Sequence, residues 1–185
     1  MSITPKLALG FWNAWLLLVP MAVIGGMLTA RRKDVAKRLS DMTGYTNGEK
    51  LFTMAASLLP YPFMGVALFT PLASSCALCL VVGSGLSALG SIGFLCTLLV
   101  FMRTPADQAL QSGPFRLSRN PLYVSAALVF LGVCLCTGSL LLTGILALML
   151  ILQHFMILAE ERMCRGRYGG AYLAYAQKTP RYLGW

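Results

Sequence analysis

The chain has 185 residues, of which 57% are apolar and only 11% are charged, against roughly 45–50% and about 25% in soluble domains. So little charge cannot cover a water-soluble globule, and so much apolar surface excludes a disordered chain, which leaves a protein embedded in the lipid bilayer. The net charge of +9 comes without a continuous basic face or a nucleic-acid motif, so we expect no nucleic-acid partner.

The first apolar run, residues 7–30, has 24 residues without a charge. As a helix it would extend about 36 Å, enough to cross a bilayer. The basic cluster Arg31-Arg32-Lys33 follows the run, so the positive-inside rule leaves the N-terminus outside.

The next apolar run, residues 51–102, has 52 residues and predicts two spans, 51–70 and 76–102. Proline and the polar residues of segment 70–75 favour a turn between them. Pro60 and Pro62 predict a kink within the first of these spans. The second span is rich in glycine and serine, which predicts close packing of helix backbones.

The last apolar run, residues 121–159, predicts spans 121–137 and 140–159 divided at Cys136-Thr137-Gly138-Ser139. Lys and Arg number 6, 3 and 5 on the three loops assigned inside and 1 outside. We therefore predict an all-α membrane protein in one domain, 1–185, a bundle of five transmembrane helices with the C-terminus in the cytoplasm.

Two predicted cytoplasmic segments contain candidate functional residues. In segment 107–123, Gly113-Pro114 favours a turn and Asn120-Pro121 starts a helix. Free amides at that helix start, beside Arg116 and Arg119, suit a carboxylate or a phosphate. An ordinary loop with positive-inside arginines remains the alternative.

The second segment begins at His154 and contains adjacent carboxylates at the end of the last span. Glu160 is expected to face inward because it continues the span, with Glu161 turned about 100° away from it; the alternative is that both are solvated. Tyr168, Tyr172 and Tyr175 predict one helical stripe in an interfacial aromatic belt.

Cysteine and histidine give little support for a metal or redox site. Five of the six cysteines lie in apolar runs, where a thiol behaves as a small hydrophobe. Cys76-x-x-Cys79 lacks the βαβ context of a redox motif, and the chain has one His. We therefore predict no metal.

The two segments resemble known signatures. Arg119-Asn120-Pro121-Leu122-Tyr123 resembles the Arg-His-Pro-x-Tyr motif of the isoprenylcysteine carboxyl methyltransferase and phospholipid methyltransferase families. Glu160-Glu161, the spaced tyrosines and Pro180-Arg181-Tyr182 are similar to those families' Glu-Glu…Phe-Gly-x-x-Tyr-x-x-Tyr signature. The resemblance covers residues 104–182 and implies an integral membrane methyltransferase that uses S-adenosylmethionine.

The resemblance also implies a cofactor site formed by segments 104–123 and 154–182 and covered by the C-terminal tail. Carried over by motif, the cofactor contacts are Asp107, Gln108, Ala109, Leu110, Phe115, Arg119, Asn120, Pro121, Leu122, Tyr123 and Glu160. The helix start and the arginines suit the methionine carboxylate, and Glu160 suits the ribose or the amino group.

Three residues depart from the family pattern. Asn120 stands where the family commonly has His. Bacterial-looking members of the family often have Asn at this position, so we expect the protein to lie in a bacterial or archaeal cell membrane. Phe115 replaces the usual Tyr, which loses a hydroxyl but keeps ring stacking. Met156 stands where the prenylcysteine enzymes carry an arginine that binds the substrate carboxylate, which makes Met156 a candidate substrate contact and argues against that carboxylate.

The resemblance implies methyl transfer to a hydrophobic acceptor from the bilayer, prenylcysteine-like or a lipid. An amine acceptor must lose a proton, for which Glu161 and His154 are candidate catalytic bases. The alternatives are a phospholipid amine N-methyltransferase and, in another class, a non-catalytic small transporter or assembly factor. Spans without charged residues argue against a transporter.

Overall fold

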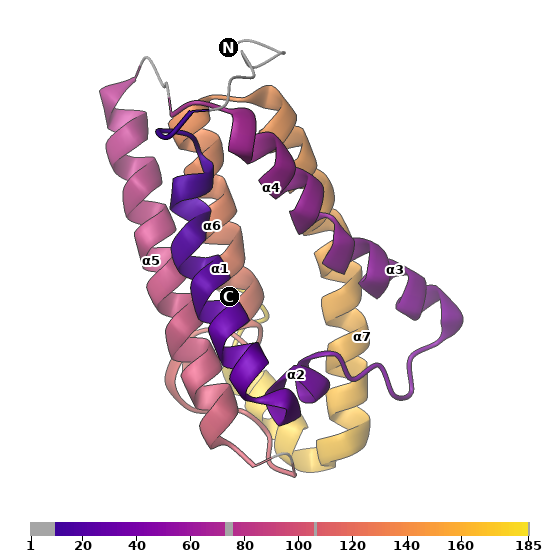
Figure 1. The fold of residues 1–185 in the computed structure, drawn as a ribbon. Helices are drawn as coiled ribbons and strands as arrows, with labels where there is room; N and C mark the ends of the chain where they lie inside the picture. The colour runs from indigo at the N-terminus through magenta and orange to yellow at the C-terminus, as the bar shows by residue number, and fades with distance from the viewer. Residues whose placement is uncertain (1–9, 73–75, 106, 185) are drawn as a thin grey trace.

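The computed structural model describes residues 10–72, 76–105 and 107–184, and within them it contains helices and no strand. The helices are α1 (Trp15–Arg31), α2 (Lys33–Leu39), α3 (Asn47–Leu58), α4 (Pro60–Phe69), α5 (Ala77–Arg103), the 3₁₀ turn η1 (Gly113–Arg116), α6 (Pro121–Thr137) and α7 (Leu140–Lys178). The long helices run side by side, and the short α2 lies across one end of the bundle (Figure 1). The predicted all-α class is confirmed.

A helix lies on each of the five predicted spans, although residues 7–9 and 73–75 fall outside the described part of the chain. Asn47–Phe69, Ala77–Arg103 and Leu140–Lys178 are long and apolar enough to cross a membrane, and α1 with α2, bent by 113°, would make a fourth span. Helix α6 is apolar but has 17 residues. The chain is thus a helical integral membrane protein, and the count of five spans stays a prediction.

The helix boundaries follow the turn residues. Helix α3 ends at Leu58 and α4 starts at Pro60. The predicted span 51–70 is therefore interrupted where its proline predicts a kink. Gly138, with φ 60°, ends α6 in the left-handed conformation that favours glycine. The hairpin between α6 and α7 therefore turns at the predicted position.

Helices α5 and α6 pack closely because three glycines let the backbones meet. A Cβ built on Gly132 would lie 2.3 Å from the carbonyl oxygen of Gly83, and one on Gly90 would lie 2.6 Å from that of Ser125. Ser87 Oγ donates a hydrogen bond across the contact to the carbonyl oxygen of Val129, at 3.2 Å. The predicted packing role of the small residues is confirmed.

Helices α1, α4, α6 and α7 enclose the main apolar core. The rings of Phe63 and Phe130 meet edge to face, 4.8 Å apart, and Val133 and Leu142 beside them are fully buried. This core joins the C-terminal half of α6 to the N-terminal part of α7. The start of α6 and the region of α7 near Glu160 lie outside it and form the polar site.

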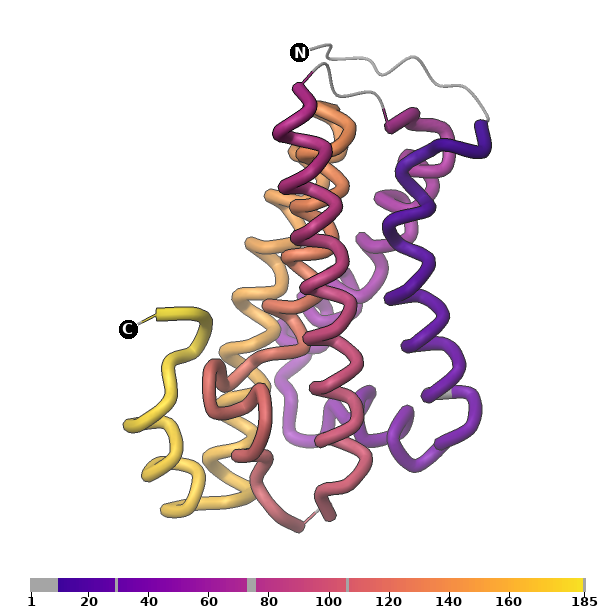
Figure 2. Tube along the Cα trace, turned by 90° about the vertical axis from the view of Figure 1, so that its left-hand side faces the viewer, coloured from indigo at the N-terminus to yellow at the C-terminus, as the bar shows by residue number. Residues whose placement is uncertain are grey.

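The last helix, α7, changes direction at Gly169. Its apolar part ends at residue 159, and beyond it the helix carries charged residues. Gly169 has φ 53° and ψ −130°, a conformation that only glycine adopts readily. The chain folds back from this point, so residues 170–178 return alongside the bundle (Figure 2).

Candidate functional site

The loop before α6 is shaped by its turn residues. Gly113, with φ 57°, begins η1, and Pro114 is the next residue of this turn. Pro121 begins α6, as predicted. The Phe115 ring and the Asn120 side chain of this loop are buried. The loop therefore packs into the protein interior and is more than an exposed connection between two helices.

Among the acids of the site, Glu161 has the most hydrogen-bond and ion-pair partners. Its side chain is 3% exposed and lies 3.6 Å from Arg119 Nε. It accepts hydrogen bonds from Arg181 Nε and Nη2 at 3.1 and 2.9 Å and from Asn120 Nδ2 at 3.2 Å. The expectation that Glu161 turns away from the interior is wrong, because the arginines of the loop and the tail converge on it.

Glu160 has a different environment. It is partly buried, and the Tyr123 hydroxyl donates a hydrogen bond to its Oε1. Among the described residues, no Lys or Arg forms an ion pair with Glu160. Its carboxylate therefore keeps acceptor capacity that Glu161 has already used.

The C-terminal tail is fastened to the loop before α6. The backbone amide of Arg119 donates to the carbonyl oxygen of Pro180 at 2.9 Å. Ser118 Oγ and Asn120 Nδ2 both donate to the carbonyl oxygen of Arg181, at 3.0 and 3.1 Å. Three hydrogen bonds and the Glu161 ion pair thus hold the tail against the loop.

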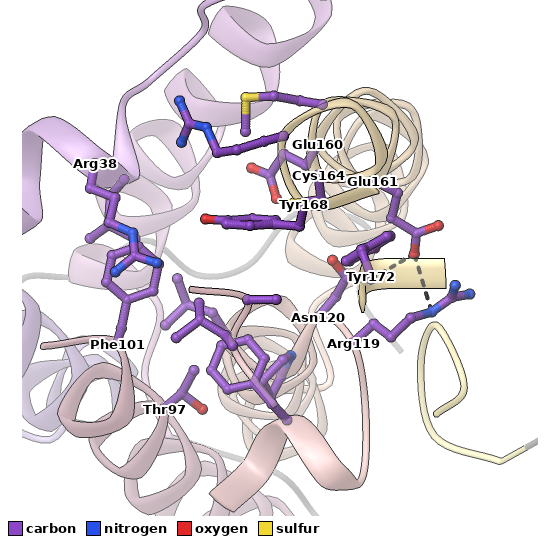
Figure 3. A pocket seen from close by; sticks show the side chains of 18 of the residues that line it. Arg38, Thr97, Phe101, Arg119, Asn120, Glu160, Glu161, Cys164, Tyr168 and Tyr172 are labelled. Atoms are coloured by element: carbon purple, nitrogen blue, oxygen red, sulfur yellow. Dashed lines mark hydrogen bonds and ion pairs between the residues drawn. The ribbon is translucent and has the colours of Figure 1, made fainter. Parts of the chain in front are cut away.

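A cavity of about 150 Å³ lies between these segments (Figure 3). Nine of the eleven predicted cofactor contacts line it: Ala109, Leu110, Phe115, Arg119, Asn120, Pro121, Leu122, Tyr123 and Glu160. Glu161 lines it as well. Two segments separated by the α6–α7 hairpin therefore meet at one place.

The other two predicted contacts, Asp107 and Gln108, line an adjoining hollow of about 710 Å³. The hollow shares Ala109, Arg167 and Tyr168 with the inner cavity. The inner cavity alone is smaller than typical ligand pockets of roughly 300–1,000 Å³. An extended ligand would therefore occupy both spaces.

His154 and Met156, two further candidate residues that precede Glu160 on α7, do not line the cavity. His154 lines a separate groove between α6 and α7, where its Nδ1 is 2.7 Å from the Tyr182 hydroxyl. Met156 is 6% exposed and belongs to the lining of neither the cavity nor the groove. The structure does not bring Met156 to the site, because it lies one helical turn deeper than Glu160 and packs inward.

Sequence reasoning missed part of the site that comes from segment 33–46. Arg38, Asp41 and Tyr45 line the cavity. Arg38 Nη1 donates to the carbonyl oxygen of Thr104 at 2.8 Å, and its guanidinium lies 4.5 Å from the centre of the Phe101 ring. No local motif marks these residues, since the positive-inside rule already accounts for basic residues in that loop.

An ion pair with α7 holds this segment in place. Arg167 Nη2 lies 2.8 Å from Asp41 Oδ2. Hydrogen bonds from Thr43 and then from Arg167 hold the pKa of the Asp41 carboxyl down to about 2. The pair is therefore charged at neutral pH and joins segment 33–46 to α7.

The tyrosines after Gly169 belong to the site. Tyr172 and Tyr175 are buried together with Phe115, and the Tyr175 hydroxyl donates to the Phe115 carbonyl oxygen at 2.6 Å. The aromatic-belt interpretation is wrong for these two residues. Tyr168, which precedes the reversal at Gly169, packs against the same cluster, and all three tyrosines line the cavity.

The cysteines have structural contacts. Cys76 Sγ accepts a hydrogen bond from the backbone amide of Cys79 at 3.3 Å and so caps the start of α5. Cys136 is buried where α6 meets α5. Among the described residues, no group of three or more His, Cys, Asp or Glu is arranged to hold a metal ion.

Comparisons with known proteins relate this chain to a family of membrane enzymes. The family model described as phospholipid methyltransferase matches residues 72–171, more than half of the chain. A curated relative, the cobalt-zinc-cadmium resistance protein CzcN of Cupriavidus metallidurans, is 30% identical over 96 residues, 52% of this chain and 44% of the relative. The match thus spans less than half of that relative's length, and no solved structure matches the chain. The chain belongs to the phospholipid methyltransferase family, a class of membrane methyltransferases.

Proposed function

We propose that this protein transfers a methyl group from S-adenosylmethionine to a hydrophobic acceptor that enters from the bilayer, a prenylcysteine-like molecule or a lipid. The observation that carries the proposal is the Glu160 carboxylate, which faces the cavity without an ion pair to any described Lys or Arg. A partly buried acid at such a place needs a partner, and a cationic ligand would provide one.

The groups that line the cavity suit this cofactor. Arg119 Nε is buried without a hydrogen-bond partner among the described residues, since its Glu161 oxygen is 3.6 Å away. This donor suits the methionine carboxylate, whereas Glu160 suits the amino group or the ribose hydroxyls. The rings of Phe115 and Tyr168 offer flat apolar surface for adenine.

Asp107 and Gln108 would contact the end of the cofactor that extends into the adjoining hollow. The bound cofactor supplies a methyl group on a positively charged sulfur. The protein then has to hold the reactants in line and keep water out. Tyr123 orients Glu160, and the tail fastened at Pro180 and Arg181 covers one side of the site.

An amine acceptor gives up one proton as its nitrogen forms the bond to the methyl carbon. We assign that proton to His154 in the tautomer whose Nδ1–H donates to the Tyr182 hydroxyl, at 2.7 Å, because the other ring nitrogen is then the acceptor. Glu161 is less suited to this role because Arg181 and Asn120 already engage its oxygens. Its role is to anchor the loop and the tail.

The position of Met156 bears on the acceptor. A carboxylate acceptor would need a cation at that position, and Met156 is apolar and buried. A phospholipid amine is therefore the second candidate acceptor, and the family description supports it.

The principal test is calorimetric titration of S-adenosylhomocysteine into the purified protein and its Glu160→Gln variant. We expect the variant to bind more weakly by about 1–3 kcal/mol, the range for a charge-assisted hydrogen bond, which is roughly 5- to 150-fold in affinity. Asp34→Asn is the matched control, because Asp34 is an exposed acid paired with Arg32 at the surface. Equal affinity of wild type and Glu160→Gln would remove Glu160 from the cofactor site.

Methyl transfer itself is tested with tritiated S-adenosylmethionine, a total lipid extract and prenylcysteine analogues. A labelled lipid product supports the proposal and names the acceptor class. Absence of both binding and transfer would favour the non-catalytic alternative, a small transporter or assembly factor.

We also propose that the chain forms one membrane domain with five spans, the N-terminus outside and the C-terminus in the cytoplasm of a bacterial or archaeal cell. A reporter fused after Trp185 should then be active only in the cytoplasm, and one fused before Met1 only outside. Both reporters on the same side of the membrane would refute an odd number of spans.

A further inference from the structure

A groove of about 500 Å³ runs between α6 and α7. Its outer edges are exposed apolar side chains: Leu131 is 42% exposed and Leu150 is 45% exposed. Tyr182 and Leu183 of the tail close one end. The groove is thus open to the surroundings of the helices along its length.

The groove is polar at one end and apolar at the other. His154, Gln153 and Tyr182 line the end next to Tyr123, and leucines line the end that reaches Leu131. On α6 these ends are eight residues apart, about 12 Å along the helix. This is the shape and polarity of an amphiphile with its headgroup near Tyr123.

Tyr123 connects the groove with the cofactor cavity, since it lines both. Its hydroxyl is bonded to Glu160 on the cavity side. A headgroup at the polar end of the groove would therefore be separated from the cavity by one side chain.

We propose that this groove binds the hydrocarbon chain of the methyl acceptor, and that the His154–Tyr182 pair binds an amine headgroup at its inner end. This inference rests on the proposed function and adds the place and the polarity of the acceptor. An amine fits better than a carboxylate, because the groove lining contains no described Lys or Arg and Glu160 lies just beyond Tyr123. The imidazole and the phenol can both accept a hydrogen bond from an amine.

The test is photolabelling of the protein in lipid nanodiscs by dodecylamine with a diazirine at the end of its chain, without S-adenosylmethionine. Labelled residues are found by mass spectrometry. Leu150→Trp fills the groove, and Leu148→Trp is the matched control two residues away on α7, with 47% exposure and outside the lining. Crowding of about 1–3 kcal/mol should lower groove labelling by about 5- to 150-fold in Leu150→Trp only.

The headgroup is tested with a dodecanoate probe of the same design and with Tyr182→Phe. We expect the amine to label the groove more strongly than the carboxylate, and Tyr182→Phe to weaken amine labelling by about 2- to 10-fold, the effect of one hydrogen bond. Equal labelling by the two probes would overturn the headgroup assignment. Equal labelling of the two tryptophan variants would overturn the groove assignment and indicate general contact with lipid.

Titration of S-adenosylhomocysteine into the same variants separates this proposal from the proposed function. We expect Leu150→Trp to bind it as wild type does, which also shows that the variant is folded. Groove labelling without any binding of S-adenosylhomocysteine would overturn the proposed function and leave the groove as a site for an amphiphile.

Discussion

Replacing Gly132 by Ala should lower the melting temperature of the purified protein by about 6–12 °C. The added Cβ would lie 2.3 Å from the Gly83 carbonyl oxygen and from Ser87 Oγ, and 2.9 Å from the Ser87 backbone nitrogen. Backbone cannot move aside as a flexible side chain can, so α5 and α6 must separate. We expect a cost of about 3 kcal/mol, at the upper end for overpacking, which gives the stated shift for a chain of this size.

Gly85→Ala is the matched control. Gly85 lies on α5 near Gly83, but a Cβ there has nothing within 4 Å. This variant should melt at the wild-type temperature or slightly above it, since alanine favours a helix. A nanodisc or detergent melting curve measures both. Similar melting of the two variants would mean that α5 and α6 do not pack at this distance.

Glu161→Gln should destabilise the protein by about 3 kcal/mol and release the C-terminal tail. Removing one partner of a buried ion pair leaves the other charges uncompensated, and this is the low end of the cost because Arg181 is 31% exposed. Without the anchor, Arg119 and Arg181 lose the acid that joins the loop to the tail. Thermal unfolding measures the loss of stability, and faster digestion by carboxypeptidase measures the release of the tail.

Arg165→Gln tests the same ion cluster at its weak edge. Arg165 lies 3.9 Å from Glu161 and its side chain is 53% exposed, so its removal should change stability by less than about 0.5 kcal/mol. If Glu161→Gln were as mild as Arg165→Gln, the anchoring role of Glu161 would be wrong.

The sequence predicted the local features of this protein well. Glycine and proline define turns through their own backbone preferences, so the starts and ends at Gly138, Pro121 and Pro60 could be predicted without knowing the fold. Hydropathy in the same way predicted a helical membrane protein, because any long apolar segment must satisfy its backbone within a helix in lipid. Nine predicted contacts line one cavity: Arg119, Asn120, Pro121 and Glu160 were indicated by the residues themselves, and the family resemblance added the other five.

The residues that sequence reasoning missed or misplaced have long-range causes. Arg38 and Asp41 reach the cavity through pairs with Thr104 and Arg167, far along the chain. Neither partner can be inferred from local spacing, since ion pairs and carbonyl contacts leave no periodic signal in the sequence.

Which of Glu160 and Glu161 anchors the C-terminal tail also depends on contacts between segments far apart in the chain. A helix places adjacent residues about 100° apart, so the sequence alone determined that the two carboxylates face different surroundings. It also indicated, through motifs that are short and local, a resemblance to the family of membrane methyltransferases to which the chain belongs. Only the tertiary structure decided which acid is the anchor, because the reversal at Gly169 brings Arg181 back to Glu161 and leaves Glu160 with Tyr123. That outcome depends on how helices pack, and packing depends on contacts between segments that the local sequence does not relate.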